Sequence, residues 1–96
     1  MKLVVHPAAQ RELDDALGWS KAAFGDRAAA GLRRRFEQVG QLLMQQPAIG
    51  TPVAGQVRKL RLGRFPYSLV YRLNAEDITV IAVAHQSRLP GHWVGR

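Results

Sequence analysis

Three strand-like runs in the second half of the chain limit its fold more than any other feature. Residues 56–62, 67–73 and 78–84 are rich in β-branched, aromatic and other apolar side chains, and Gly, Pro, Asn and Asp occur in the turns between them, 63–66 and 74–77. Consecutive strands joined by such short turns pair antiparallel. The last run is apolar on both faces, as expected of a central strand that helices cover on at least one side. This half therefore predicts a three-stranded antiparallel meander.

The side chains of the first two runs alternate, which predicts the face each one occupies. Leu60 and Leu62 point to one side of the sheet, and Lys59 and Arg61 point to the other. The apolar side of the second run consists of Tyr67, Leu69, Tyr71 and Leu73. We expect its two tyrosines in the core; the alternative is that they are platforms on which nucleobases stack.

The first half of the chain predicts a short strand and a helix. Residues 2–6 form a short apolar run that Pro7 closes, and proline is favoured at the first position of a helix. One helix face consists of Ala9, Leu13, Ala16, Leu17, Ser20 and Phe24. The solvent side consists of Gln10, Arg11, Glu12, Asp14 and Asp15. We expect the helix to end at Gly25.

A second helix is predicted over residues 27–45, with Asp26 as its cap. Its apolar stripe consists of Leu32, Phe36, Val39 and Leu43. The consecutive residues Arg33, Arg34 and Arg35 spread around the helix and are expected to be a solvated face. Residues 47–55 contain two prolines and two glycines and are expected to form a loop.

These elements predict one α+β domain spanning residues 1–96, with the order β-α-α-β-β-β. A helical hairpin would pack on a small, mainly antiparallel sheet. The chain has no cysteine, no apolar run long enough to cross a membrane and no leader-like start. We therefore expect a cytoplasmic protein that has no membrane partner.

The charge of the chain, +7 overall, is concentrated in the sheet half. Residues 1–46 hold seven Lys and Arg against five Asp and Glu, whereas residues 47–96 hold seven against two. A basic sheet indicates an anionic partner: nucleic acid, an RNA-rich machine or an acidic protein.

Histidines and arginines near the end of the chain are the candidates for chemistry. His85, Arg88 and His92 follow the last strand, and Lys59, Arg61 and Arg64 lie in the preceding hairpin. Histidine exchanges protons near neutral pH, and arginine holds phosphate, so these residue types suit a metal-free ribonuclease. The alternative is that they have only structural roles.

No cofactor or metal is expected. His85 and His92 lack the spacing of a helical pair and a nearby carboxylate, and no glycine-rich loop follows a strand. Trp93 follows Pro90-Gly91 and is expected to anchor the end of the chain on the domain; stacking on a nucleobase is the alternative.

The chain resembles the RelE/ParE superfamily of bacterial toxins from type II toxin–antitoxin systems. The resemblance covers essentially the whole chain, and its most specific parts are Tyr-Ser-Leu-Val-Tyr-Arg at 67–72 and Ala-His-Gln-Ser-Arg at 84–88. It implies one of two activities. RelE-like members cut mRNA on the ribosome, whereas ParE-like members share the fold, lack the catalytic set and inhibit DNA gyrase. Either branch implies a cognate antitoxin with an acidic, partly disordered segment.

The resemblance also assigns residues. Arg64 and Arg88 take positions resembling the nuclease arginines, and His92 stands about where some nucleases carry a tyrosine. The C-terminal tyrosine itself is missing, the nuclease lysines are represented by Lys59 alone, and residues 84–87 are more similar to the ParE side. We therefore expect a ParE-like toxin, with a ribosome-dependent mRNA endonuclease as the alternative.

Two sets of site residues follow, and whether the chain is an enzyme is left open. A nuclease would use Arg64, His85, Arg88 and His92. Target or antitoxin contacts would come from Arg58, Lys59, Arg61, Arg64, Arg88 and Trp93. The antitoxin is expected to cover the basic sheet and the apolar edge of the helical hairpin.

Overall fold

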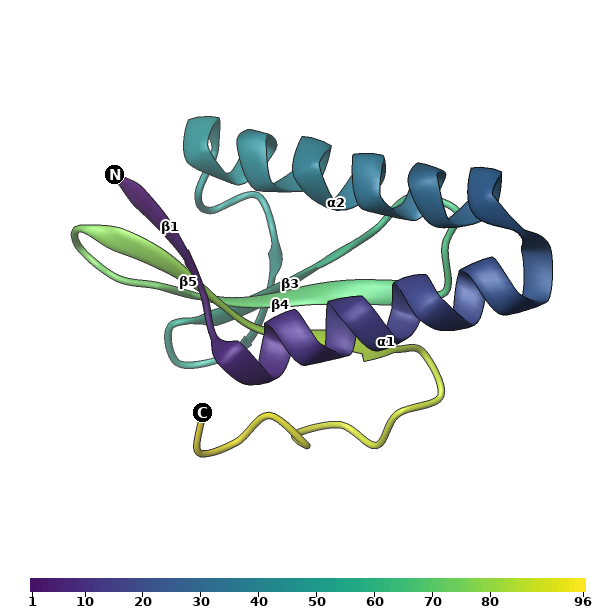
Figure 1. Cartoon of the computed structure of the whole chain (residues 1–96). Helices are drawn as coiled ribbons and strands as arrows, with labels where there is room; N and C mark the ends of the chain where they lie inside the picture. Colours follow the sequence, from purple (N-terminus) through teal and green to yellow (C-terminus); the bar gives the residue numbers. More distant parts are fainter.

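The computed structural model describes residues 1–96 as two helices and a five-stranded sheet (Figure 1). The elements are β1 (Lys2–Val5), α1 (Pro7–Phe24), α2 (Asp26–Gln45), β2 (Thr51–Ala54), β3 (Val57–Arg61), β4 (Tyr67–Leu73) and β5 (Asp77–His85). The strand order is β1-β5-β4-β3-β2, in which β1 pairs parallel with β5 and every other pair is antiparallel. The predicted α+β fold, a helical hairpin on a mainly antiparallel sheet, is confirmed.

Strand β2 was not predicted, because residues 47–55 were expected to be a loop. Thr51 pairs with Lys59 and Pro52 with Arg58, so β2 adds an edge strand to the meander. Proline is tolerated in an edge strand because its missing N–H faces solvent. All four residues of β2 are exposed, so no apolar alternation marks the strand in the sequence.

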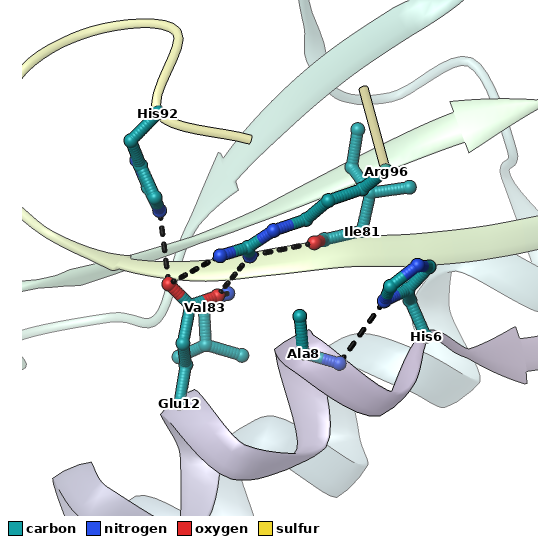
Figure 2. Close-up of polar contacts among 7 residues, drawn as sticks. All are labelled: His6, Ala8, Glu12, Ile81, Val83, His92 and Arg96. Atoms are coloured by element: carbon teal, nitrogen blue, oxygen red, sulfur yellow. Dashed lines mark hydrogen bonds and ion pairs between the residues drawn. The ribbon is translucent and has the colours of Figure 1, made fainter. Parts of the chain in front are cut away.

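The start of α1 follows the sequence closely. Pro7 is the first helical residue, and the His6 ring accepts a hydrogen bond from the Ala8 N–H through Nδ1 at 3.0 Å (Figure 2). An accepting side chain at this position satisfies an N–H that has no partner within the helix. The predicted cap of α2 was wrong: Gly25 is the N-cap, and Asp26 is the first helical residue.

The main core lies between the helical hairpin and one face of the sheet. It contains the predicted helix residues Leu13, Leu32 and Leu43, together with Leu69 and the fully buried Tyr71 of β4. The parity of β3 is also confirmed, because Leu60 packs against this core while Lys59 and Arg61 are exposed.

Phe24 does not join the core, contrary to its predicted place on the buried face of α1. It is 70% exposed and contacts Trp19, itself 54% exposed, edge to face with ring centroids 5.5 Å apart. The tip of the helical hairpin extends past the start of β4, so the sheet has no surface there to cover Phe24 (Figure 1).

A second, smaller apolar cluster lies on the other face of the sheet. It consists of Val57, Val70, Ile81 and Ala82, and Trp93 packs against it. Residues 86–96, here called the tail, run along the side of the molecule away from α2 (Figure 1). The predicted anchoring of the chain end by Trp93 is confirmed.

An irregularity in the pairing of β4 with β5 sets which β5 side chains reach each of the two apolar clusters. Val70 pairs with Ala82 and Tyr71 with Val80, which leaves Ile81 as an extra residue. A bulge shifts the alternation of side chains along a strand. Val80 and Val83 consequently both reach the main core, while Ile81 packs in the cluster on the tail side.

Neither helix has the length and apolar character needed to span a membrane.

Candidate functional site

The tail covers a hollow of about 190 Å³ on the face of the sheet opposite the helices. Strands β2, β3, β4 and β5 contribute to its floor, and the tail forms its wall. The polar and aromatic side chains that line this tail hollow are Lys59, Ser68, His85, Gln86, Arg88, His92 and Trp93. The structure therefore brings Lys59 together with four other predicted site residues, which are His85, Arg88, His92 and Trp93.

A carboxylate from α1 fixes the tail in place. Glu12 Oε2 lies 2.9 Å from His92 Nε2, and Glu12 Oε1 lies 2.6 Å from Arg96 Nη1 (Figure 2). The Val83 N–H also donates to Glu12 Oε1 at 3.2 Å, and Arg96 donates to the Ile81 carbonyl at 3.0 Å. The Glu12 cluster thus joins α1, β5 and the second half of the tail, through His92 and Arg96.

The environment of Glu12 favours its ionised form. Burial alone would raise the pKa of this carboxyl, but hydrogen bonds from Arg96, His92 and the Val83 N–H outweigh burial, so the pKa lies below its ordinary value. The carboxylate therefore accepts, and His92 donates through Nε2. The His92 side chain is only 9% exposed.

Glu12 was predicted on the solvent side of α1, and this placement was wrong. Its side chain is 18% exposed because the tail folds over it. The partners lie 80 and 84 residues away in the sequence, so no local pattern reveals them. Arg96 was likewise not among the predicted site residues. In the sequence, its positive charge is the only feature that suggests a pairing with Glu12.

His85 lies at the end of β5 and is committed to a local turn. Its Nδ1 accepts from the Ser87 N–H at 3.1 Å and lies 2.7 Å from Ser87 Oγ. Since Nδ1 accepts the Ser87 N–H, a neutral ring carries its proton on Nε2. The ring also packs edge to face on Tyr67, with centroids 5.2 Å apart. In this arrangement His85 presents a donor rather than a base.

Tyr67 is also unsuited to accept a proton. Burial raises the pKa of its phenol above the ordinary value, so the hydroxyl is protonated at neutral pH. Both tyrosines of β4 belong to the main core, as predicted.

The remaining basic candidates lie elsewhere. Arg64 lines a different hollow, between α2 and the turn from β3 to β4, and does not meet His85, Arg88 and His92. Arg58 points to the helix side and donates to the carbonyls of Ala48 and Gly50 at 3.0 and 2.8 Å. Arg61 is exposed. No three His, Asp or Glu side chains gather in a way that would hold a metal ion.

The chain has a helical hairpin on a mixed, mainly antiparallel sheet, and the tail lies over the basic face of that sheet. This is the fold class of RelE/ParE-like toxins. The family described as "ParE toxin of type II toxin-antitoxin system, parDE" matches residues 3–90, and the chain belongs to this family.

A solved structure described as the chromosomal ParDE TA system from P. aeruginosa has a similar fold, with a TM-score of 0.77. The match covers 88% of this chain and 95% of that chain at 22% sequence identity, so this likeness concerns the fold. The comparison with curated proteins finds no match.

Proposed function

We propose that this toxin inhibits DNA gyrase by binding it and that a cognate antitoxin neutralises the toxin. One observation carries the choice over RNA cleavage: the ring nitrogen Nε2 of His92 is held by Glu12, and the His92 side chain is only 9% exposed. His92 stands where some nucleases of the superfamily carry a tyrosine, so a nuclease would need this group at its substrate.

The arrangement of the other nuclease candidates supports the same choice. General acid–base catalysis needs a group within hydrogen-bond reach of the proton that it moves. His85 uses Nδ1 to bind Ser87, and Arg64 lines a separate hollow. The tail hollow retains cationic side chains, Lys59 and Arg88, that suit binding to an anionic or acidic surface.

The alternative is a ribosome-dependent mRNA endonuclease. It is favoured by the shared position of Lys59, His85 and Arg88 in one hollow, because these residue types bind and neutralise phosphate. Release of the tail on the ribosome would be required to free His92 Nε2 from Glu12.

Induction of the toxin in bacteria separates the two activities. A gyrase inhibitor produces filamentation and a DNA-damage response while transcripts remain intact. A nuclease produces rapid arrest of translation and cuts in register with codons. Transcript cleavage without a DNA-damage response would overturn the gyrase proposal. A supercoiling assay with purified gyrase provides the direct readout.

Variants test whether the tail hollow contacts the target. We expect the double substitution Lys59→Glu and Arg88→Glu to abolish gyrase inhibition, because it reverses the charge of the hollow while leaving the core unchanged. Arg27→Glu is the matched control, because Arg27 is exposed and lies outside the tail hollow. Equal inhibition by the double variant and the control would exclude the hollow as the contact.

The antitoxin is proposed to cover the basic outer face of the sheet and the apolar tip of the helical hairpin. Lys59 and Arg61 supply exposed charge for an acidic segment that folds on binding, and Trp19 and Phe24 supply exposed aromatic surface. Arg58 is a poor probe of this interface because its guanidinium holds the loop before β2.

Isothermal titration with a purified antitoxin tests both parts of this interface. Lys59→Glu with Arg61→Glu, and separately Trp19→Ala with Phe24→Ala, are expected to weaken binding, whereas Arg27→Glu is not. Unchanged affinity in either double variant would remove that part from the proposed interface.

A further inference from the structure

A second basic hollow lies between α2 and the turn that joins β3 to β4. It is shallow and is lined by Gly31, Arg34, Arg35, Gln38, Gly63, Arg64 and Phe65. Three arginines line the hollow and no acidic residue does. We call it the arginine hollow. It is separate from the tail hollow, with which it shares no residue.

The arginines of this hollow lack internal partners of the kind that Arg58 and Arg96 have. Arg58 donates to two loop carbonyls, and Arg96 is paired with Glu12. By contrast, Arg34, Arg35 and Arg64 form no ion pair, and the hydrogen bond recorded for them is one of 3.4 Å from Arg35 to Gln38. These three groups do not contribute to the fold through charge pairing.

Arg35 gives the strongest sign that an acceptor is missing. Its Nε is buried and donates to no oxygen, and it is the one buried side-chain polar atom of the protein left without a partner. A buried N–H without an acceptor is unfavourable, and more so in a charged group. An oxygen supplied from outside the chain would satisfy this donor if the guanidinium moved away from the turn that covers it.

The backbone of the turn is shaped to let Arg35 approach. Gly63 has a φ of +61°, and a Cβ at this position would lie 2.9 Å from Arg35 Nε. Glycine therefore allows the guanidinium to lie directly on the turn. The next residue, Arg64, extends over the Phe65 ring with 5.6 Å between Cζ and the ring centroid. Glu37 is the acidic residue of α2 nearest in sequence to Arg35, but it lines a different hollow, beside Leu3.

The chemistry of the hollow selects its ligand. Three cationic forks without a counter-charge suit an anion that carries more than one charge and several acceptor oxygens. A carboxylate has one charge and two oxygens, whereas a terminal phosphate group has up to two charges and three free oxygens. Phe65 is the one apolar side chain in the lining and is partly buried against the core, so little surface is offered to a base.

We propose that the arginine hollow binds a terminal phosphate group, either as free inorganic phosphate or at the end of a nucleotide or oligonucleotide. The site is independent of the tail hollow and of the action on gyrase. Its occupancy would satisfy the buried Nε of Arg35 and neutralise part of the charge of the chain.

The test is a titration of the full chain followed by ¹H–¹⁵N NMR at constant ionic strength, reading the backbone N–H signals of 63–65 and the Arg35 Nε–H signal. The probes are inorganic phosphate, a nucleoside 5′-monophosphate, and one oligonucleotide with and without a 5′-phosphate. Acetate is the carboxylate control. We expect saturable shifts at these signals with phosphate and no saturation with acetate. A response restricted to the nucleotide or the 5′-phosphorylated oligonucleotide would identify the source of the group.

Matched variants complete the test. Arg34→Ala with Arg64→Ala removes two forks and is expected to weaken binding roughly tenfold or more. Arg33→Ala, also exposed on α2 but outside the hollow, is the control and is expected to bind as the unmodified chain does. Equal affinity of the double variant and the control, equal responses to acetate and phosphate, or equal binding of both oligonucleotides would overturn the proposal. Because the readout is binding, loss of gyrase inhibition would leave this result unaffected.

Discussion

Tyr71 combines a fully buried ring with two hydrogen bonds that hold the loop between α2 and β2. Its hydroxyl donates to the Pro47 carbonyl at 2.7 Å and accepts from the Gly50 N–H at 2.9 Å. A Cβ at position 50 would lie 2.6 Å from this oxygen, so only glycine fits beside it. The side chain of Tyr71 thus holds the loop at two points and requires glycine at position 50.

We expect Tyr71→Phe to lower the free energy of unfolding by about 1–3 kcal/mol, because the Gly50 N–H is left buried without its acceptor. Urea unfolding measures the change. Tyr67→Phe is the control, since no hydrogen bond is recorded for the Tyr67 hydroxyl, and it should have little effect. Equal losses in the two variants would show that the loss does not come from the hydrogen bonds of the Tyr71 hydroxyl.

Glu12 is the other residue whose role depends on distant partners. We expect Glu12→Gln to lower the free energy of unfolding by about 1–3 kcal/mol, because charge-assisted hydrogen bonds from His92 and Arg96 are lost. Hydrogen exchange of the tail should rise at the same time. Asp15→Asn, an exposed neighbour on α1, is the control. A slow-exchanging tail in the Glu12 variant would contradict this role.

At this scale the sequence predicts burial better than contacts. The alternation of β4 places Tyr71 in the core correctly, because alternation is a local property of a strand. The same local reasoning fails for Glu12, which occupies a polar position of the helix but is covered by a tail from the far end of the chain. Arg34 and Arg35 were expected to be simply solvated, and their proximity to Gly63 and Arg64 depends on tertiary structure.

Among the elements, the tail is the one held mainly by polar contacts, and this makes it sensitive to pH. The folded pKa of Glu12 lies below its ordinary value of 4.5. The stabilisation from ionised Glu12 is therefore complete above about pH 4.5 and is lost as the pH falls through the lowered pKa. Acid should release the tail.

The fluorescence of Trp93 reports this release, once Trp19 is replaced by Phe to leave a single tryptophan. We expect a red shift of Trp93 emission below pH 4.5, before far-UV circular dichroism changes, because the ring leaves the cluster around Ile81. Adding Glu12→Gln should give the shifted spectrum already at neutral pH and remove the acid step. Emission that changes only with global unfolding would contradict the prediction.

The elements that the sequence predicts well are those with an amphipathic period and clear end signals. Helix α2 was predicted within one residue of its observed start, because its apolar stripe, Gly25 and Pro47 all mark it. Strand β2 was missed because an exposed edge strand buries nothing and needs no alternation. The exposure of Phe24 was missed because the period of a helix does not reveal where the sheet beneath it ends.

In the whole molecule, the two faces of the sheet have different roles. The helix side is filled by the main core, whereas the other side carries a small apolar cluster, the tail and exposed basic residues. The class of fold and the concentration of charge were predictable from order and composition. The separation of Arg64 from the tail hollow was not, because it depends on which face each turn residue takes.

This division predicts how inhibition depends on the amount of toxin. A toxin that acts by occupying a surface inactivates one target per molecule, whereas an enzyme turns over. In a titration of purified toxin against fixed gyrase, we expect supercoiling activity to fall in proportion and to reach its minimum near equimolar toxin, provided that gyrase exceeds the dissociation constant. Inhibition by the variant Lys59→Glu with Arg88→Glu should require a much higher toxin concentration, and inhibition by Arg27→Glu should not.

The same distinction applies to RNA cleavage. Translating ribosomes in large excess over toxin should retain intact mRNA, because the proton-transfer groups at the hollow, His85 and His92, are committed to Ser87 and Glu12. Complete cleavage of that mRNA by a small amount of toxin would show turnover and would replace the binding mechanism with the nuclease.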